Sequence, residues 1–279
     1  MENGFATDDF VRRVLEEDLG TGGDVTSAAT IGENDRFAAE LSCREAVVVA
    51  GLDLATAFFR ALDPEIRIEV PARDGDRLEA GAILMRMKGL ARPMLAAERS
   101  ALNTLQHLSG IATLTRRYVD AIAGTGAVLL DTRKTIPGLR VLEKYATRMG
   151  GARNHRMRLD DGVLIKDNHV AVAGGVGAAV RATKAGNSGL EVQVEVDRVE
   201  QITEALDAGA DRLLLDNMDV PTLRKAVELV AGRVPAEASG GVNLDTIRAI
   251  AETGVDFISV GRITQSAPAV DIGMDYALQ

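Results

Sequence analysis

The hydrophobic and polar positions follow two different patterns along the chain. From residue 1 to about residue 100, strand-like and helical stretches are mixed, and turns rich in glycine and aspartate separate them. Alternating side chains predict strands at 36–43, 46–51, 66–70 and 82–87, and helical spacing predicts helices at 10–19 and 54–62. We therefore predict a small domain built around a sheet in this part of the chain.

From about residue 96 the pattern becomes regular. A long helix is predicted at 96–123, and six apolar strands then alternate with amphipathic helices. The strands are predicted at 127–132, 162–167, 191–197, 212–217, 236–241 and 257–262. The helices between them include 139–149, 176–184, 199–208, 220–230 and 244–253. Such alternation indicates parallel strands that are buried on both faces.

The carboxyl ends of the six strands carry polar residues or glycine. An open doubly wound sheet and a barrel both fit the alternation, but in barrels the chemistry collects at these strand ends and the final loops hold phosphate. Six strands are fewer than the usual eight. We predict an α/β fold with an N-terminal α/β open sandwich domain at 1–102 and a short, incomplete parallel α/β barrel at 103–267. The tail 268–279 is expected to pack back on the first domain.

Composition narrows the classes of function. The net charge of −9 argues against a nucleic-acid-binding surface, which needs to be basic. The acidic N-terminus does not resemble a signal peptide, and no stretch approaches the ~20 apolar residues of a membrane span. The single cysteine, Cys43, fits a reducing compartment and lies in a strand, where a small buried residue is expected. These features predict a cytoplasmic protein without nucleic-acid or membrane partners.

Cations gather around three strand ends of the predicted barrel. Residues 131–169 contain nine Lys or Arg but only five Asp or Glu, although the whole chain is acidic. Three of these cations are expected on a solvated helix face: Arg140, Lys144 and Arg148. Arg133, Lys134 and Lys166 instead lie at or just after apolar strands, where barrel geometry points them into the mouth. Guanidinium groups suit carboxylates and ammonium groups suit phosphates, so the cluster predicts a multiply anionic ligand.

Two carboxylates and two glycine sites face the same mouth. Glu195 and Asp216 each end an apolar strand, which suggests Mg²⁺ held with the help of substrate oxygens, or direct stabilisation of a cationic transition state. For Asp216 a structural helix cap is the alternative. The Ser-Gly-Gly run at 239–241 and Gly261 are predicted to offer backbone N–H groups to phosphate.

The long helix contributes two further polar residues. Arg99 stands next to Glu98, an arrangement that usually forms a surface pair. His107 is expected to be a packed, hydrogen-bonded histidine. No Ser/His/Asp or Cys/His arrangement in the sequence indicates a nucleophile.

A series of short motifs runs in a fixed order through nearly the whole chain. The motifs are EDLG and GDVT within 17–26, AERSALN at 97–103, HLSGIAT at 107–113, DTRKT at 131–135, EKYA at 143–146, NHRM at 154–157, LIKDNH at 164–169, EVD at 195–197, LLDN at 214–217, EASGGV at 237–242 and SVG at 259–261. In this order they resemble the quinolinate phosphoribosyltransferases, which are type II phosphoribosyltransferases.

The resemblance implies a fold, an assembly and a reaction. The family combines an N-terminal α/β sandwich with a short α/β barrel and forms homodimers in which each N-terminal domain faces the partner's barrel. Phosphoribose passes from phosphoribosyl pyrophosphate to quinolinate, and loss of CO₂ gives nicotinate mononucleotide and pyrophosphate in NAD biosynthesis. Mg²⁺ is the implied cofactor, and the two substrates are the implied small-molecule partners.

The resemblance also implies roles by position. The residues implied for quinolinate are Arg99, supplied by the neighbouring subunit, and Thr132, Arg133, Lys134, His155, Arg156 and Lys166. Those implied for phosphoribosyl pyrophosphate are Lys134, Lys166, Glu195, Asp216, Ser239, Gly240, Gly241 and Gly261. Arg262, which follows Gly261, is added as a candidate for the phosphate because of its charge and position. The implied catalytic residues are Lys134, Lys166, Glu195 and Asp216, and the last two would hold the metal directly or through substrate.

Three positions depart from the family pattern. Arg262 follows SVG where a small residue is common, Gln265 stands where His is frequent, and Arg158 follows NHRM where Gly is usual. Arg262 would either pair with the 5′-phosphate of phosphoribosyl pyrophosphate or point outward to a carboxylate such as Asp271 or Asp256.

Two other functions remain open at this stage. A paralogous type II phosphoribosyltransferase would join a different nitrogenous acid to phosphoribose, and a molybdenum-transport-associated homologue would not be an enzyme of this kind. Three arginines and a histidine in one pocket suit a dicarboxylate, which argues against the first alternative. The presence of all four implied catalytic residues argues against the second.

Overall fold

The computed structural model describes residues 5–186 and 189–277, which form two compact units. The first unit takes its described residues from 1–116, 141–151 and 266–279, and the second takes them from 117–140 and 152–265. The long helix α4 (Ala91–Ala121) begins five residues earlier than the predicted helix and continues from the first unit into the second. The domain boundary expected after residue 102 therefore lies inside this helix.

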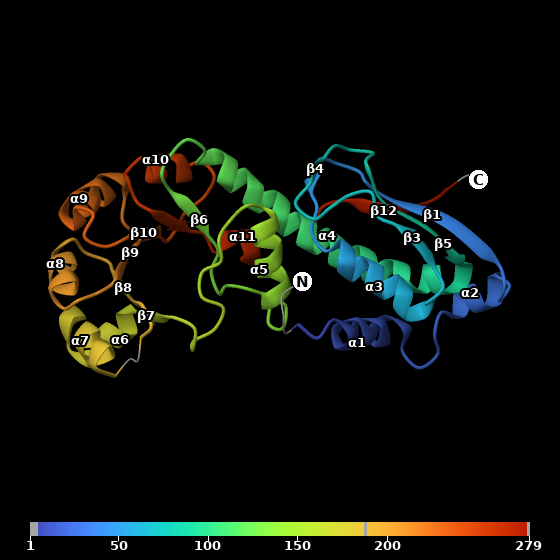
Figure 1. Ribbon diagram of the computed structural model, residues 1–279, viewed down its shortest axis with the longest axis horizontal. Coiled ribbons are helices and arrows are strands. Elements are labelled where there is room, and N and C mark those ends of the chain that lie inside the picture. Colours follow the sequence, from blue (N-terminus) through green and yellow to red (C-terminus); the bar gives the residue numbers. More distant parts are fainter. Residues whose placement is uncertain (1–4, 187–188, 278–279) are drawn as a thin grey trace. The chain divides into compact units, whose positions relative to one another are not determined.

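The first unit contains an antiparallel sheet with the strand order β12-β1-β5-β3. Its strands are β1 (Arg36–Cys43), β3 (Arg67–Glu69), β5 (Ile83–Leu90) and β12 (Ile272–Tyr276). The C-terminal strand pairs with β1, with Tyr276 opposite Ala39. Figure 1 shows α4 running beside this sheet.

The strand expected at 46–51 is shorter than predicted. It is confined to β2 (Val47–Val48), which pairs with β4 (Arg77–Leu78). Just beyond it, the backbone N–H of Ala50 donates to the Ser109 hydroxyl at 3.1 Å. Val49 still exchanges backbone hydrogen bonds with Asp76 and Gly75, so a hydroxyl of α4 serves the other edge of this segment in place of a further strand.

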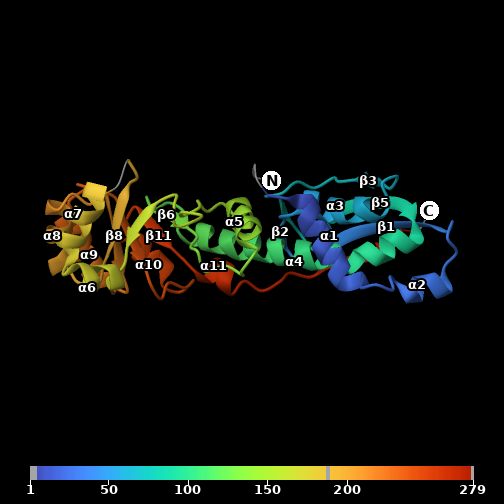
Figure 2. The same ribbon diagram turned by 90° about the horizontal axis from the view of Figure 1, so that it is seen from below.

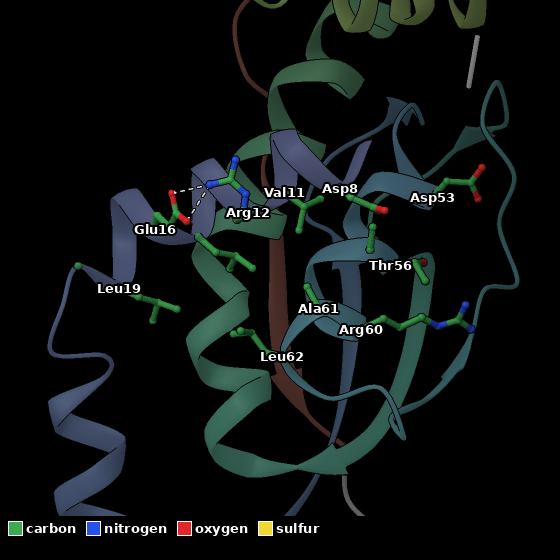
Figure 3. A pocket seen from close by; sticks show the side chains of 13 residues that line it. Asp8, Val11, Arg12, Glu16, Leu19, Asp53, Thr56, Arg60, Ala61 and Leu62 are labelled. Carbon is green, nitrogen blue, oxygen red and sulfur yellow. Dashed lines mark hydrogen bonds and ion pairs between the residues drawn. The ribbon is translucent and has the colours of Figure 1, made fainter. Parts of the chain in front are cut away.

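Three shorter helices complete the N-terminal part of the first unit. They are α1 (Thr7–Leu19), α2 (Val25–Thr30) and α3 (Leu52–Leu62). The helices predicted at 10–19 and 54–62 are thereby confirmed. Val11 and Leu15 of α1 are buried, and a surface hollow of about 870 Å³ lies between α1 and α3. Figure 3 shows Arg12 paired with Glu16 beside this hollow. The Nη1 atom of Arg12 lies 2.9 Å from Oε1 of Glu16.

Helix α5 (Arg140–Met149) corrects one expectation from the sequence. Lys144 and its neighbour Glu143 are fully buried, so the prediction that Lys144 lies on a solvated face is wrong. Glu143 lies 3.0 Å from the Nε2 atom of His107, which confirms His107 as a packed, hydrogen-bonded histidine. Cys43 is buried and has a free thiol, as expected.

The second unit is built on a six-stranded parallel sheet with the order β6-β11-β10-β9-β8-β7. Its strands are β6 (Val128–Leu130), β7 (Val163–Ile165), β8 (Val192–Val196), β9 (Arg212–Asp216), β10 (Ala236–Ser239) and β11 (Phe257–Ser259). All six predicted strands are present. No ladder joins the edge strands β6 and β7 within the described residues, so the sheet does not close. The predicted α/β fold with an incomplete parallel barrel is confirmed.

Helices cover the outer side of this sheet. They are α6 (Asp167–Ala173), α7 (Val176–Gly186), α8 (Glu200–Asp207), α9 (Val220–Val230), α10 (Ile247–Ala251) and α11 (Arg262–Gln265). Figures 1 and 2 show α7, α8 and α9 outside strands β8 and β9. Helix α10 is shorter than the predicted 244–253, because residues 244–246 and 252–254 form turns at its two ends. Among the described helices, none has both the length and the apolar character needed to cross a bilayer.

Candidate active site

The second unit contains a cavity of about 700 Å³ at the carboxyl ends of its parallel strands. Its wall comes from the residues that end each strand or follow it, as the barrel hypothesis requires. The site residues expected in this unit all line it: Thr132, Arg133, Lys134, His155, Arg156, Lys166, Glu195, Asp216, Ser239, Gly240, Gly241, Gly261 and Arg262. Arg99 does not line it; this residue is an exposed position on α4 in the first unit.

The charges that line the cavity do not cancel. Five cationic side chains, from Arg133, Lys134, Arg156, Lys166 and Arg262, face three carboxylates, from Glu195, Asp216 and Glu237. In the hollow of the first unit, by contrast, Arg12 is already neutralised by Glu16. The excess of positive charge marks the second cavity as a site for an anionic ligand.

Two arginines in this cavity lie close enough for the charge of one to act on the other. Burial lowers the pKa of Arg156, and the nearby charge of Arg133 lowers it further, although Asp161 acts in the opposite direction. The guanidinium of Arg156 donates to the carbonyl oxygen of Gly162 at 2.9 Å, which is a neutral acceptor. The Nε atom of Arg133 is buried and has no hydrogen-bond partner among the described residues. This pair has two forks to offer to carboxylates.

His155 is fixed on both sides of its ring. Its Nδ1 atom accepts the backbone N–H of Arg156 at 2.8 Å, and its Nε2 atom lies 3.1 Å from the Oε1 atom of Gln193. The backbone N–H of His155 donates to the buried carboxylate of Asp131 at 2.8 Å. The side chain is 14% exposed and lines the cavity. His155 is therefore held in a single orientation before any ligand binds.

Lys166 and the two strand-end carboxylates form the acidic side of the cavity. The Nζ atom of Lys166 lies 3.1 Å from Oε2 of Glu195, and the Glu195 side chain is only 12% exposed. Burial raises the pKa of Asp216, although the hydrogen bond from Asn217 and the charge of Lys166 oppose the shift. Asn217 donates to this carboxylate at 2.6 Å.

The glycines of this cavity allow close approach between neighbouring loops. Gly240 has a φ of +90°, and a Cβ atom built on it would lie 2.9 Å from the backbone nitrogen of Asn217. A Cβ atom on Gly261 would lie 2.7 Å from Cδ of Lys134. Gly241 also has positive φ, at +62°, but a Cβ atom there would meet no atom within 4 Å. Among these three, Gly240 is the one that combines a left-handed conformation with backbone packing that leaves no room for a Cβ atom.

The loop that carries Thr132 and Lys134 is hydrogen-bonded to α11, the short helix that follows the last barrel strand. The Thr132 hydroxyl accepts the N–H of Lys134 at 3.1 Å, and the Thr264 hydroxyl donates to the Lys134 carbonyl at 2.7 Å. This bond joins the loop after β6 to α11. It places Lys134 against Gly261 at the predicted phosphate-binding end of the cavity.

Two of the three unusual residues lie at this end of the cavity, and one does not. Arg262 and Gln265 line the cavity. No ion pair holds Arg262 within the part of the chain that the structure describes, so the outward pairing with Asp271 or Asp256 is not seen. Burial raises the pKa of Tyr118, and the nearby charge of Arg262 opposes this shift. Arg158 instead pairs with Asp160 at 2.8 Å on the surface.

Several polar residues of the site were not predicted from the sequence. Glu237 lines the cavity floor, and Asn217 and Asn243 line its wall. Gln193 and Asp131 do not line it but orient His155. Strand alternation offers a signal for two of them, because Glu237 precedes Ser239 by two residues and Gln193 precedes Glu195 by two. Residues two apart on a strand share one face.

The donor atoms present in the cavity fit one kind of metal site. Glu195 and Asp216 offer hard carboxylate oxygens, which suit Mg²⁺. Within residues 5–186 and 189–277, however, no group of three or more His, Cys, Asp or Glu side chains is arranged to hold a metal. The donor set therefore fits a Mg²⁺ ion that takes most of its ligands from substrate oxygens and water.

Two family models together match nearly the whole chain. The N-terminal domain model of quinolinate phosphoribosyl transferase matches residues 24–109, and the C-terminal domain model matches residues 111–275.

Individual proteins are similar over the same length. A nicotinate-nucleotide pyrophosphorylase [carboxylating] from Mycobacterium leprae is 43% identical and covers 97% of both chains. A probable enzyme of the same name from Bacillus subtilis is 41% identical and covers 94% of this chain and 90% of its own. The crystal structure of nicotinate-nucleotide pyrophosphorylase from Ehrlichia chaffeensis superposes with a TM-score of 0.94 at 38% identity, covering 99% of this chain and 100% of its own.

Proposed function

This chain belongs to the quinolinate phosphoribosyltransferase family, and on that premise we propose that its cavity transfers phosphoribose from phosphoribosyl pyrophosphate to quinolinate. The products are nicotinate mononucleotide, pyrophosphate and CO₂, and the reaction belongs to NAD biosynthesis. The observation that carries the choice of acceptor is the pair of neighbouring guanidinium groups of Arg133 and Arg156, neither of which forms an ion pair within the described residues. A dicarboxylate supplies one carboxylate to each fork, whereas a monocarboxylate would leave one of them unpaired.

The residues on the quinolinate side of the site act by holding this substrate in a fixed orientation. Arg133 and Arg156 hold the two carboxylates, and Thr132 and His155 bound the same part of the cavity. Fixing the ring in this way aims its nitrogen at the anomeric carbon of the second substrate, and such orientation lowers the barrier of a bimolecular step. No nucleophilic side chain is required.

The phosphoribosyl side combines cations, carboxylates and backbone amides. Lys134 and Lys166 neutralise the departing pyrophosphate, and the loops at 239–241 and 261–262 receive the 5′-phosphate. Glu195 and Asp216 face the ribose, where their charge stabilises the oxocarbenium character of the anomeric carbon. When bound, Mg²⁺ supplies charge neutralisation of the pyrophosphate, and Glu195 and Asp216 would hold it together with substrate oxygens.

The two bond changes balance without a redox step. The ring nitrogen forms a bond to the anomeric carbon as the bond from that carbon to pyrophosphate breaks. The nitrogen is then positively charged. When CO₂ leaves, the electron pair of the carbon–carboxylate bond stays on the adjacent ring carbon, where the positive nitrogen stabilises it. The ring carbon takes a proton to complete nicotinate mononucleotide.

We propose that the active unit is a homodimer with shared sites. Arg99 is exposed on α4 and has no place in the cavity of its own second unit. A guanidinium delivered from the neighbouring subunit would add a third fork for quinolinate. A cytoplasmic location is proposed because the single cysteine is a buried, free thiol.

The activity is tested with quinolinate labelled in the 2-carboxylate. The purified protein is incubated with phosphoribosyl pyrophosphate and Mg²⁺, and labelled CO₂ and nicotinate mononucleotide are measured together. We expect them in equal amounts, and no nucleotide when nicotinate replaces quinolinate. Lys166→Met serves as the inactive control. Nucleotide formation from nicotinate, or no release of CO₂, would contradict the proposed function.

A further inference from the structure

Glu237 is a fully buried carboxylate in the interior of the parallel sheet. It lies on β10 and is 0% exposed, and the Nη2 atom of Arg212 donates to its Oε2 at 2.6 Å. The guanidinium of Arg212 also stacks on the Phe257 ring, 3.9 Å from its centre. A buried carboxylate with such a close cation remains ionised, because burying the charge is tolerable only when it is paired. Glu237 therefore accepts hydrogen bonds and donates none.

This property determines the direction of every bond that leads from Glu237 to the cavity. The side-chain amide of Gln193 lies 2.9 Å from Oε2 of Glu237, so it must present its N–H group to the carboxylate. The carbonyl of Gln193 then faces His155, whose Nε2 atom lies 3.1 Å away. An oxygen acceptor at that distance requires the proton of the imidazole to be on Nε2.

The opposite ring nitrogen completes the chain. With its proton on Nε2, neutral His155 offers the lone pair of Nδ1, and the backbone N–H of Arg156 donates to it at 2.8 Å. Arg156 is one of the two guanidinium groups proposed to bind quinolinate. A series of oriented hydrogen bonds thus runs from Arg212 and Glu237 through Gln193 and His155 to the backbone of Arg156.

We propose that Glu237 is a positioning residue for the quinolinate side of the active site. Its ionised carboxylate sets the orientation of Gln193, which holds His155 in the Nε2–H tautomer, and that tautomer anchors the main chain of Arg156. The role in quinolinate binding rests on the proposed function, whereas the tautomer of His155 follows from the network alone. The second oxygen of this carboxylate, Oε1, is buried and has no hydrogen-bond partner among the described residues.

Several charged groups surround the imidazole of His155. Glu237 lies 3.7 Å from Nε2, and Arg212 pairs with Glu237 behind it. Asp131 accepts the backbone N–H of His155, and Arg133 and Arg156 line the cavity beside it. Adding a proton to Nδ1 would cost the bond to the Arg156 N–H group.

Glu237→Gln removes the charge while keeping the size of the side chain. In the wild type Arg212 and Gln193 both donate to Oε2 of Glu237. The amide oxygen of the variant accepts from Arg212 without the negative charge that holds Gln193, so Gln193 is no longer fixed and can turn its own N–H group toward His155. That orientation selects the Nδ1–H tautomer, which has no lone pair for the Arg156 N–H group. The anchoring bond is lost without the removal of any group proposed to contact substrate.

The first test is the tautomer of His155, read from the nitrogen resonances of histidine-labelled full-length protein. The chain contains three histidines, and His107→Gln and His169→Gln identify the other two signals. We expect the neutral form of wild-type His155 to carry its proton on Nε2. In Glu237→Gln the Nδ1–H form should appear. A wild-type proton on Nδ1, or an unchanged tautomer in the variant, would overturn the proposal even if the enzyme is active.

The second test separates the two substrates. In Glu237→Gln the KM for quinolinate should rise about tenfold, and the KM for phosphoribosyl pyrophosphate should change by less than about twofold. Gln193→Met breaks the same chain but leaves the pair of Glu237 and Arg212 intact, so it should give the same split if Glu237→Gln does not fold. Equal changes in both KM values, in whichever variant folds, would overturn the positioning role.

Glu143→Gln is the matched control. Glu143 is also fully buried beside a histidine, His107, at 3.0 Å, but it belongs to the first unit. This substitution should alter the His107 signal and lower stability. It should leave the His155 tautomer unchanged and produce no selective rise in the KM for quinolinate.

Discussion

Replacing Arg133 by methionine should weaken quinolinate binding without lowering the stability of the protein. The Nε atom of Arg133 is buried without a hydrogen-bond partner, and its side chain makes no hydrogen bond or ion pair within the described residues. Its charge also acts unfavourably on Arg156. Methionine keeps the apolar stem and removes the charge and the unpaired donor. The folded protein therefore gives up no hydrogen bond when the guanidinium is removed.

The expected magnitudes have opposite signs. A buried donor without a partner costs about 1–3 kcal/mol, so the free energy of unfolding of Arg133→Met should be unchanged or higher by up to about 3 kcal/mol. In a chain of this size each kcal/mol raises Tm by roughly 2–4 °C. Loss of a charge-assisted contact to a desolvated carboxylate costs about 2–4 kcal/mol of binding, which weakens quinolinate affinity by roughly 30- to 1,000-fold.

Calorimetric titration with quinolinate and thermal unfolding without ligand measure the two effects in the same preparation. Arg233→Met is the control, because Arg233 donates to the carbonyls of Leu229 and Val230 at 2.8 and 3.2 Å, away from the cavity. It should lower Tm and leave quinolinate affinity unchanged. If Arg133→Met lowers Tm as the control does, or binds quinolinate as the wild type does, the reasoning about an unsatisfied binding arginine is refuted.

Three further predictions concern other parts of the site. Gly240→Ala should raise the KM for phosphoribosyl pyrophosphate at least tenfold, and more than Gly241→Ala does. Both residues have positive φ, but only the Cβ atom at position 240 would collide with backbone. Equal KM values for the two variants would count against this. Mixing inactive Arg99→Ala with inactive Lys166→Ala should restore part of the activity through hybrid dimers, and no recovery after verified subunit exchange would exclude a shared site. Arg262→Ala should raise the KM for phosphoribosyl pyrophosphate about tenfold and leave quinolinate titrations unchanged, whereas equal losses for both substrates would rule out a phosphate contact.

The sequence predicted the elements that are determined locally. All six barrel strands were found because each is an apolar run with a polar carboxyl end, a pattern that depends on neighbouring residues only. The pairing of β12 with β1 could be expected only as a returning tail, since the partners are more than 200 residues apart. Burial of Lys144 was missed for a related reason: its surroundings are set by tertiary packing, and the charged sequence around it is typical of an exposed helix.

The sequence contains a signal for polar residues in the interior of the sheet that we did not use. Once Ser239 and Glu195 are placed at the mouth, alternation puts Glu237 and Gln193 one layer below them on the same face. The ladders set Gln193 beside Arg212 and Glu237 beside Leu214, so an amide, a cation and a carboxylate come from three adjacent strands. Which of them hydrogen-bond, and in which direction, depends on side-chain positions that alternation does not contain.

The cations of the cavity differ in what they do before substrate arrives, and this difference decides which substitution is informative. Lys166 is already paired with Glu195 at 3.1 Å, so removing it changes a preformed ion pair as well as any contact to substrate. Arg212 does not line the cavity; it is paired with Glu237 in the interior of the sheet. Arg133 has no such partner. Its unsatisfied guanidinium is compensated only when an anion binds, so a change at Arg133 reports on that anion without breaking a preformed ion pair.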